Sequence, residues 1–305
     1  MKTRRDFSFS KTKELADKHR HIIYHTIAIV TVCIWGTTFV STKTLINAGL
    51  SPVEVLLYRF ILAYTCIWTI AHKRLFADTI KDEIMLSLGG LCGGSLYFIA
   101  ENTALSITLA SNVSLLICTT PIFTFLLCKI CYKDQLSRKM IYGSLTALLG
   151  VGMVVFNGSM VLKIKPLGDM LTLVAALLWA IYSLILRQLS HKYSNLFITR
   201  KIFFYSIMSL IVYFMFFPLE TKWQTLAQPT VYANLLFLGI VASMLCYIMW
   251  NAVIKVLGTN KTSNYIYVTP LVTFLTSAIF LSEPMTVIST IGAALILFGV
   301  YTAAK

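Results

Sequence analysis

One carboxylate in the interior of an apolar segment is the residue best placed for chemistry in this sequence. Glu101 lies well inside the apolar run 84–106. An ionisable side chain within hydrocarbon costs about 2.5 kcal/mol or more, so such a residue usually faces a protein interior or a wet cavity. Tyr97 lies one helical turn away on the same face. Glu101 is therefore either part of a site for a solute or a proton, or a buried carboxylate that pairs with Arg59 or Lys43 for stability.

Arg59 is the second charged candidate, because it lies near the start of the apolar run 52–71 on the side that holds few other cations. A guanidinium at such a position either extends toward the interface or has a counterion. Glu101 or an anionic solute would serve as that counterion.

Two amides and two indoles occupy repeated positions deep in apolar runs. Asn102 and Asn251 either hydrogen-bond between helices or lie at a seam between two halves of the protein. The candidate residues of a substrate cavity are Trp35, Tyr97, Glu101, Asn102, Trp179 and Asn251. Trp35 and Trp179 lie well inside their runs rather than near the ends. Their flat apolar faces would suit the wall of a cavity, although packing against lipid or another helix is an equal alternative.

Pro121 and Pro270 each lie inside an apolar run and each removes one backbone hydrogen bond. They would act either as hinges or as static kinks. The two alternatives stay open at this point.

Residues for catalysis, metal binding or nucleotide binding do not form any recognisable pattern. The seven cysteines are odd in number and lie in apolar runs, and Cys128–Cys131 lacks the context of a redox motif. Gly89–Gly94 lacks the Lys-Ser/Thr pair of a phosphate loop, and His21 and His25 have no further metal ligand beside them. We therefore expect no catalytic residue, no metal and no cofactor.

The composition places the chain in a membrane. Hydrophobic residues make up 57% of the 305 and charged residues 12%, and the mean hydropathy is +0.78. Because a helix needs about 20 apolar residues to cross the bilayer, we predict ten transmembrane helices. They are expected near 22–42, 52–71, 84–106, 109–128, 139–157, 168–187, 196–217, 231–254, 262–281 and 285–303.

We interpret the net charge of +14 as a set of signals that orient the chain in the membrane, rather than as a surface that binds nucleic acid. Lys and Arg residues collect in alternate loops and in the tail 1–21. Lys43, Arg59, Lys163, Lys165 and Lys222 are the exceptions. This bias predicts a multi-pass protein of the inner cell membrane with both termini, Lys305 included, in the cytoplasm.

An internal repeat relates the two halves of the sequence. The region from Gly90 matches the region from Gly239 at a constant offset, and both contain Thr-Pro-x-x-Thr-Phe-Leu, beginning at Thr120 and Thr269. The matched pairs include Asn102 and Asn251, Gly143 and Gly292, and Gly150 and Gly299, and Trp35 matches Trp179 at a slightly different offset. Five helices per half is an odd number, so the second half is expected to enter the membrane inverted.

The order and spacing of several motifs resemble those of the EamA family of ten-helix drug/metabolite transporters. The motifs are Trp35-Gly36, Arg59-Phe60, Ser111 to Pro121, Gly143 to Gly152, Trp179-Ala180, Thr269-Pro270, Ser282-Glu283-Pro284 and Gly292 to Gly299. The resemblance implies repeats over 22–157 and 168–303 and a central cavity lined mainly by helices one, three and four and six, eight and nine. This chain departs from the family at Lys133-Asp134-Gln135, where a Gly-Glu pair is usual, and at Glu101-Asn102.

The favoured interpretation is an all-α integral membrane protein that transports, and most readily exports, a small organic metabolite such as an amino acid or amine by alternating access. Its partners would be the solute, the lipid bilayer and, if Glu101 titrates, protons. The oligomeric state is left open. The alternatives are a membrane-embedded enzyme and a membrane protein that does not transport.

Overall fold

The computed structural model describes residues 4–108, 110–156, 165–281 and 286–304, and these residues form helices joined by short turns, without strands. Several sequence features lie outside the described residues: Ser282 to Pro284 of the family motif, and Lys163 and Lys305 of the charge pattern. The all-α prediction is confirmed for the described part of the chain.

The first half of the chain forms the helices on which Glu101 and Arg59 lie. Ser51 caps α2, and Glu54 completes a capping box there. The elements are α1 (Arg4–Asn47), α2 (Pro52–Ile70), α3 (Ile80–Gly90), the π-helical turn η1 (Leu91–Ser95), α4 (Leu96–Ile107), α5 (Ala110–Ile117), α6 (Thr120–Tyr132) and α7 (Arg138–Phe156).

The second half follows a similar order. The elements are α8 (Pro166–Leu189), α9 (Asn195–Phe216), α10 (Trp223–Leu226), α11 (Pro229–Leu236), the π-helical segment η2 (Phe237–Leu245), α12 (Cys246–Leu257), α13 (Thr259–Ser263), the 3₁₀ segment η3 (Asn264–Val268), α14 (Thr269–Leu281) and α15 (Val287–Ala304). The π-helical segments interrupt matching places in the two halves, just before α4 and α12.

Seven helical runs of the described residues are long and apolar enough to cross a bilayer, and Thr290–Ala303 is a shorter apolar helix. The runs are His19–Asn47, Pro52–Ile70, Ile80–Ile107, Val113–Tyr132, Pro166–Leu189, Asn195–Phe216 and Pro229–Leu257. The protein is therefore a multi-pass membrane protein. The remaining predicted spans, 139–157, 262–281 and 285–303, end or begin beside undescribed residues, and the total of ten stays a prediction.

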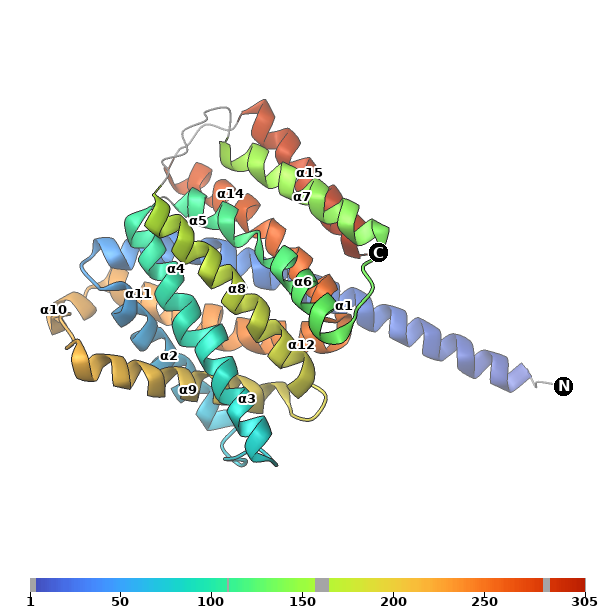
Figure 1. The fold of residues 1–305 in the computed structure, drawn as a ribbon, viewed down its shortest axis with the longest axis horizontal. Helices are drawn as coiled ribbons and strands as arrows, with labels where there is room; N and C mark the ends of the chain where they lie inside the picture. Colours follow the sequence, from blue (N-terminus) through green and yellow to red (C-terminus); the bar gives the residue numbers. More distant parts are fainter. Residues whose placement is uncertain (1–3, 109, 157–164, 282–285, 305) are drawn as a thin grey trace.

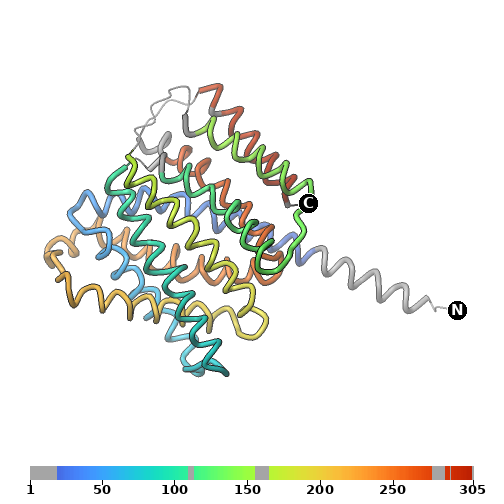
Figure 2. Tube along the Cα trace, in the orientation of Figure 1, coloured from blue at the N-terminus to red at the C-terminus, as the bar shows by residue number. Residues whose placement is uncertain are grey.

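The helices of the two halves pack against each other in matching pairs. α4 packs on α8 and α1 packs on α12, while α6 contacts α8 and α1 contacts α14. Figures 1 and 2 show α7 and α15 side by side at one edge of the bundle, with α4 and α8 crossing its centre. A central core of Phe60, Trp179, Tyr247 and other side chains joins the halves.

The turn between α8 and α9 is fixed to the start of α3. The Lys192 ammonium donates to both Asp82 carboxylate oxygens, at 2.9 and 3.1 Å, and the Tyr193 hydroxyl donates to the second of them. The hydrogen bond with Asp82 raises the pKa of Lys192. Lys192 therefore stays charged throughout the neutral range.

The helices α7 and α15 approach each other closely, backbone to backbone, at paired glycines. A Cβ atom on Gly150 would lie 2.5 Å from the Gly292 carbonyl oxygen, and one on Gly143 would lie 2.5 Å from the Gly299 carbonyl oxygen. Small residues allow this approach between membrane helices. Because residue numbers rise along α7 as they fall along α15, the two helices run antiparallel.

We predict that Gly150→Ala lowers the thermal unfolding temperature of the detergent-purified protein. The added methyl group meets backbone atoms that cannot rotate away, and overpacking of this kind costs roughly 1–3 kcal/mol. Leu149→Ala is the matched control, because Leu149 is 68% exposed on the same helix. Equal unfolding temperatures for Gly150→Ala and the wild type would contradict the tight contact.

Candidate functional site

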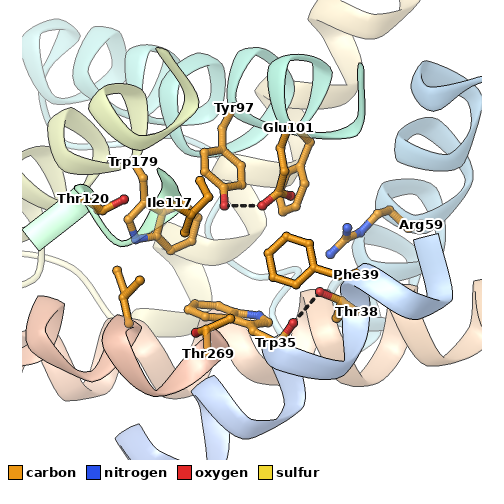
Figure 3. Close-up of a pocket in the computed structure, with 12 residues that line it drawn as sticks. Trp35, Thr38, Phe39, Arg59, Tyr97, Glu101, Ile117, Thr120, Trp179 and Thr269 are labelled. Atoms are coloured by element: carbon orange, nitrogen blue, oxygen red, sulfur yellow. Dashed lines mark hydrogen bonds between the residues drawn. The ribbon is translucent and has the colours of Figure 1, made fainter. Parts of the chain in front are cut away.

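A pocket lies at the centre of the bundle, between helices from both halves (Figure 3). The first half contributes side chains of α1, α2, α4, α5 and α6, and the second contributes α8, η3 and α14. The lining residues are Trp35, Thr38, Phe39, Arg59, Tyr97, Phe98, Glu101, Ile117, Thr120, Trp179, Ile266 and Thr269. Four of the predicted cavity residues, Trp35, Tyr97, Glu101 and Trp179, are thus brought together.

Aromatic rings form one wall of the pocket. Trp35 and Trp179 meet edge to face with ring centroids 5.3 Å apart, and Tyr97 lies 4.9 Å from Trp179. Trp250 of α12 packs behind them, 5.0 Å from Trp35. The Trp35 indole nitrogen donates to the Ala242 carbonyl at 2.9 Å, which fixes the ring of Trp35 in place.

Glu101 is buried and points into the pocket from α4. The Tyr97 hydroxyl donates a 2.7 Å hydrogen bond to its Oε1 atom, as Figure 3 shows. The two residues are one turn apart on α4, so the helix itself sets this geometry. No described residue donates to the other oxygen of Glu101 through a hydrogen bond.

Arg59 is the cation of the same pocket, but it does not form an ion pair with Glu101. Its Nε atom donates to the Ser243 hydroxyl at 2.9 Å, and its guanidinium carbon lies 4.3 Å from the centre of the Phe98 ring. The side chain is 2% exposed. Arg59 therefore does not extend toward the membrane interface, which was one of the two alternatives.

The three remaining predicted polar residues lie between helices. The Lys43 ammonium donates to the Leu105 carbonyl at 2.7 Å rather than to Glu101. Asn102 donates to the Pro52 carbonyl. Asn251 donates to the Thr199 hydroxyl at 2.8 Å and accepts from Tyr182. Neither asparagine lines the pocket, and both join neighbouring helices.

The two prolines lie in the first turns of helices rather than in helix interiors. Pro121 follows a two-residue interruption between α5 and α6, and Pro270 follows the 3₁₀ segment η3. Proline is well tolerated in a first turn, because that N–H has no helical acceptor. The preceding residues Thr120 and Thr269 line the pocket. The hinge role stays a prediction.

Several lining residues were not predicted from the sequence. The shared Thr-Pro motif pointed toward Thr120 and Thr269, and the repeat also matches Ile117 with Ile266. Thr38 and Phe39 gave no comparable signal. The eighth predicted span, 231–254, was expected in the lining from the family resemblance. It contributes Trp250 of α12 behind the wall but no lining residue.

A polar cluster joins α6, α8 and α13 at one end of the bundle. Both terminal nitrogens of Arg187 donate to the Asp134 carboxylate, and Asn260 donates to the same carboxylate at 3.1 Å. Lys133, which takes the place of the usual glycine, has the left-handed φ of 56° that glycine adopts most easily. Asp134 thereby reaches Arg187.

Within the described ranges, no three His, Cys, Asp or Glu side chains form a group that could hold a metal ion. The pocket itself offers one carboxylate, one guanidinium, hydroxyls and aromatic rings. Such an arrangement can bind a small polar or charged molecule through hydrogen bonds and ring contacts.

Several known proteins resemble this chain over most of its length. An uncharacterised transporter of Archaeoglobus fulgidus is 27% identical over 286 residues, which cover 92% of this chain and 97% of the relative. The uncharacterised transporter YyaM of Bacillus subtilis is 29% identical, with 88% and 89% covered. A probable amino-acid metabolite efflux pump of Salmonella typhimurium is 26% identical, with 90% and 92% covered.

A crystal structure shares the fold with a TM-score of 0.74 at 16% identity, covering 92% of this chain and 97% of the other. The model of the EamA-like transporter family matches the chain twice, over residues 22–156 and 166–304. With its apolar helices and a pocket between its halves, the chain belongs to the EamA-like transporter family.

Proposed function

We propose that this protein is a secondary transporter that exports a small organic metabolite such as an amino acid or amine by alternating access. The observation that carries the proposal is the pocket between the two halves, where Glu101 and Arg59 are buried within one cavity. A buried charged pocket inside a membrane protein suits the binding of a polar solute that lipid would reject.

Alternating access requires two halves that can rock against each other about a central site. Three matched pairs of the repeat, Trp35 with Trp179, Ile117 with Ile266 and Thr120 with Thr269, line the pocket together. The antiparallel contact between α7 and α15, which occupy equivalent positions, supports an inverted relation between the halves. Two inverted five-helix repeats over 22–157 and 168–303, ten spans in all, explain these contacts.

The positive residues give the orientation within this proposal. The tail 1–21 and the segments 73–81, 129–139 and 187–201, where helices end and begin again, carry 18 of the 26 Lys and Arg residues. Both termini then lie in the cytoplasm, and the cluster of Arg187, Asp134 and Asn260 lies at the cytoplasmic end. This cluster would hold the cytoplasmic side of the pocket closed.

Glu101 would couple transport to protons, because a proton and a cationic group of the solute compete for its oxygens. Release of the solute on one side would allow protonation, and deprotonation on the other side would restore the site. A proton gradient can then drive the solute across the membrane without a nucleotide.

Flux of solute through purified protein in liposomes tests the proposal directly. We expect saturable counterflow of at least one amino acid or amine, with the solute recovered chemically unchanged. Trp179→Ala should lower the rate tenfold or more, because it removes the shared wall of the pocket. Val174→Ala, at a 44% exposed position of the same helix, is the control. Chemical conversion of the solute would favour an enzyme, and absence of flux for every solute tested would favour a non-transporting protein.

Replacement of Glu101 by Gln should separate binding from proton coupling. The amide keeps the size and one acceptor oxygen but does not titrate, so solute exchange should remain measurable while the response to a pH gradient disappears. Counterflow at equal pH and flux driven by a pH gradient are compared in the same liposomes. Gradient-driven flux that persists undiminished in well-folded Glu101→Gln protein would rule out the coupling role.

The cluster at the end of α8 offers a separate test by charge exchange. Arg187→Asp places two carboxylates together and should change the counterflow rate by about two- to fivefold, since a partly exposed ion pair contributes no more than about 1 kcal/mol. Adding Asp134→Arg restores the pair in reverse and should return the rate toward that of the wild type. Equal rates for the wild type and the Arg187→Asp protein would show that the pair does not affect gating.

A further inference from the structure

The pocket contains two opposite charges that do not neutralise each other by contact. Glu101 is 7% exposed and Arg59 is 2% exposed, and both side chains line the same cavity. The ion pairs of the described residues join Arg74 with Asp78, Arg187 with Asp134, Lys192 with Asp82 and Lys201 with Glu83. Glu101 and Arg59 are absent from these pairs.

The two terminal nitrogens of Arg59 can bind an anion. Its Nε atom is used by Ser243, whereas no described residue accepts a hydrogen bond from its two terminal nitrogens. These two nitrogens form the fork that binds a carboxylate through two parallel hydrogen bonds. A guanidinium buried without a counterion is unfavourable, so an anionic ligand group would stabilise the site.

The Oε2 atom of Glu101 can bind a cationic group. Tyr97 occupies its Oε1 atom and leaves Oε2 for another donor. An ammonium group carries three donors and no acceptor, so it can bind this oxygen and the Thr hydroxyls that line the pocket. The nearby indole and phenyl faces also attract a cation.

The remaining walls are apolar. Trp35, Trp179 and Phe39 present rings, and Ile117 and Ile266 present aliphatic chains. Figure 3 shows Arg59 entering from the side of the pocket opposite Trp179, with Glu101 on a third wall. A ligand that bridges the charged groups would place its remaining atoms against the rings.

We propose that the pocket selects zwitterions that have the form of an α-amino acid with an uncharged, apolar side chain. The ligand carboxylate binds the terminal nitrogens of Arg59, and its ammonium binds Glu101. The pocket charges sum to zero, so a zwitterion keeps the buried site neutral, whereas a simple amine or a simple acid adds one uncompensated charge. This inference rests on the proposed transport function and names its substrate class.

Three ligands with one shared side chain test the proposal on the detergent-purified full-length protein. They are L-leucine, L-leucinamide, which lacks the carboxylate, and 4-methylpentanoate, which lacks the ammonium. L-phenylalanine and its two analogues form a second set. We expect titration calorimetry to show binding of at least one amino acid, with both of its analogues weaker by tenfold or more.

Two variants assign the charged ends. Arg59→Gln should remove the preference for the amino acid over its amide, and Glu101→Gln should remove the preference over the amine-free acid. Thr146→Ala, on α7 and outside the pocket lining, is the control and should keep both preferences. If Arg59→Gln does not fold, the comparison of ligands on the wild-type protein still decides the matter.

Equal affinity of the wild-type protein for an amino acid and its amide, or binding of neither amino acid, would overturn the proposal. So would a well-folded Arg59→Gln protein with an unchanged preference. These results are distinct from failure of the transport function. Selective binding without flux would contradict transport alone, and flux of a solute outside the zwitterion class would contradict the zwitterion inference alone.

Discussion

Hydrocarbon cannot hydrogen-bond, and this constraint determines where the polar side chains of the bundle lie. Lys43 is held by the Leu105 carbonyl, Asn251 by Thr199 and Tyr182, and Thr273 by the Gly36 carbonyl. Each of these contacts joins two helices that would otherwise touch only through apolar atoms. The charged groups of the pocket differ, because one carboxylate oxygen of Glu101 and two nitrogens of Arg59 have no hydrogen-bond partner among the described residues. In a membrane interior, such atoms are expected where a polar ligand binds.

The walls of the pocket follow the repeat, but its charges do not. Both halves supply a tryptophan and a Thr-Pro threonine, whereas Arg59 and Glu101 both come from the first half. The residue equivalent to Glu101 is Trp250, which packs against Trp35. In the proposed rocking of the halves, a ligand held by both charges would therefore stay with the first half while Trp179 and Ile266 move across it. Close contact between α7 and α15, which glycine permits, keeps the halves together at one edge.

Much of this arrangement could be predicted from sequence, because hydrocarbon imposes strong patterns. The helical class followed from apolar runs, and Glu101 was conspicuous because a carboxylate in such a run is costly. The repeat indicated Trp35 and Trp179 as a pair. The sequence could not show that Asn102 and Asn251 face helix contacts rather than the cavity, since polarity alone does not show which neighbour a buried side chain meets. It also could not show that Lys43 bonds a carbonyl or that Thr38 and Phe39 line the pocket, because these details depend on how helices distant in sequence are rotated.

The separation of Arg59 from Glu101 itself needs a physical cause, because opposite charges in a medium of low dielectric attract strongly. Two neighbouring residues of α4 supply it. Tyr97 holds the carboxylate through its hydroxyl, and Phe98 holds the guanidinium against its ring at 4.3 Å. The two rings also pack edge to face, with centroids 4.7 Å apart, so each ring supports the position of the other. Each charged side chain is therefore held in place before a ligand binds. A ligand that reaches both can interact with each charge, and little binding energy is lost in ordering the two side chains.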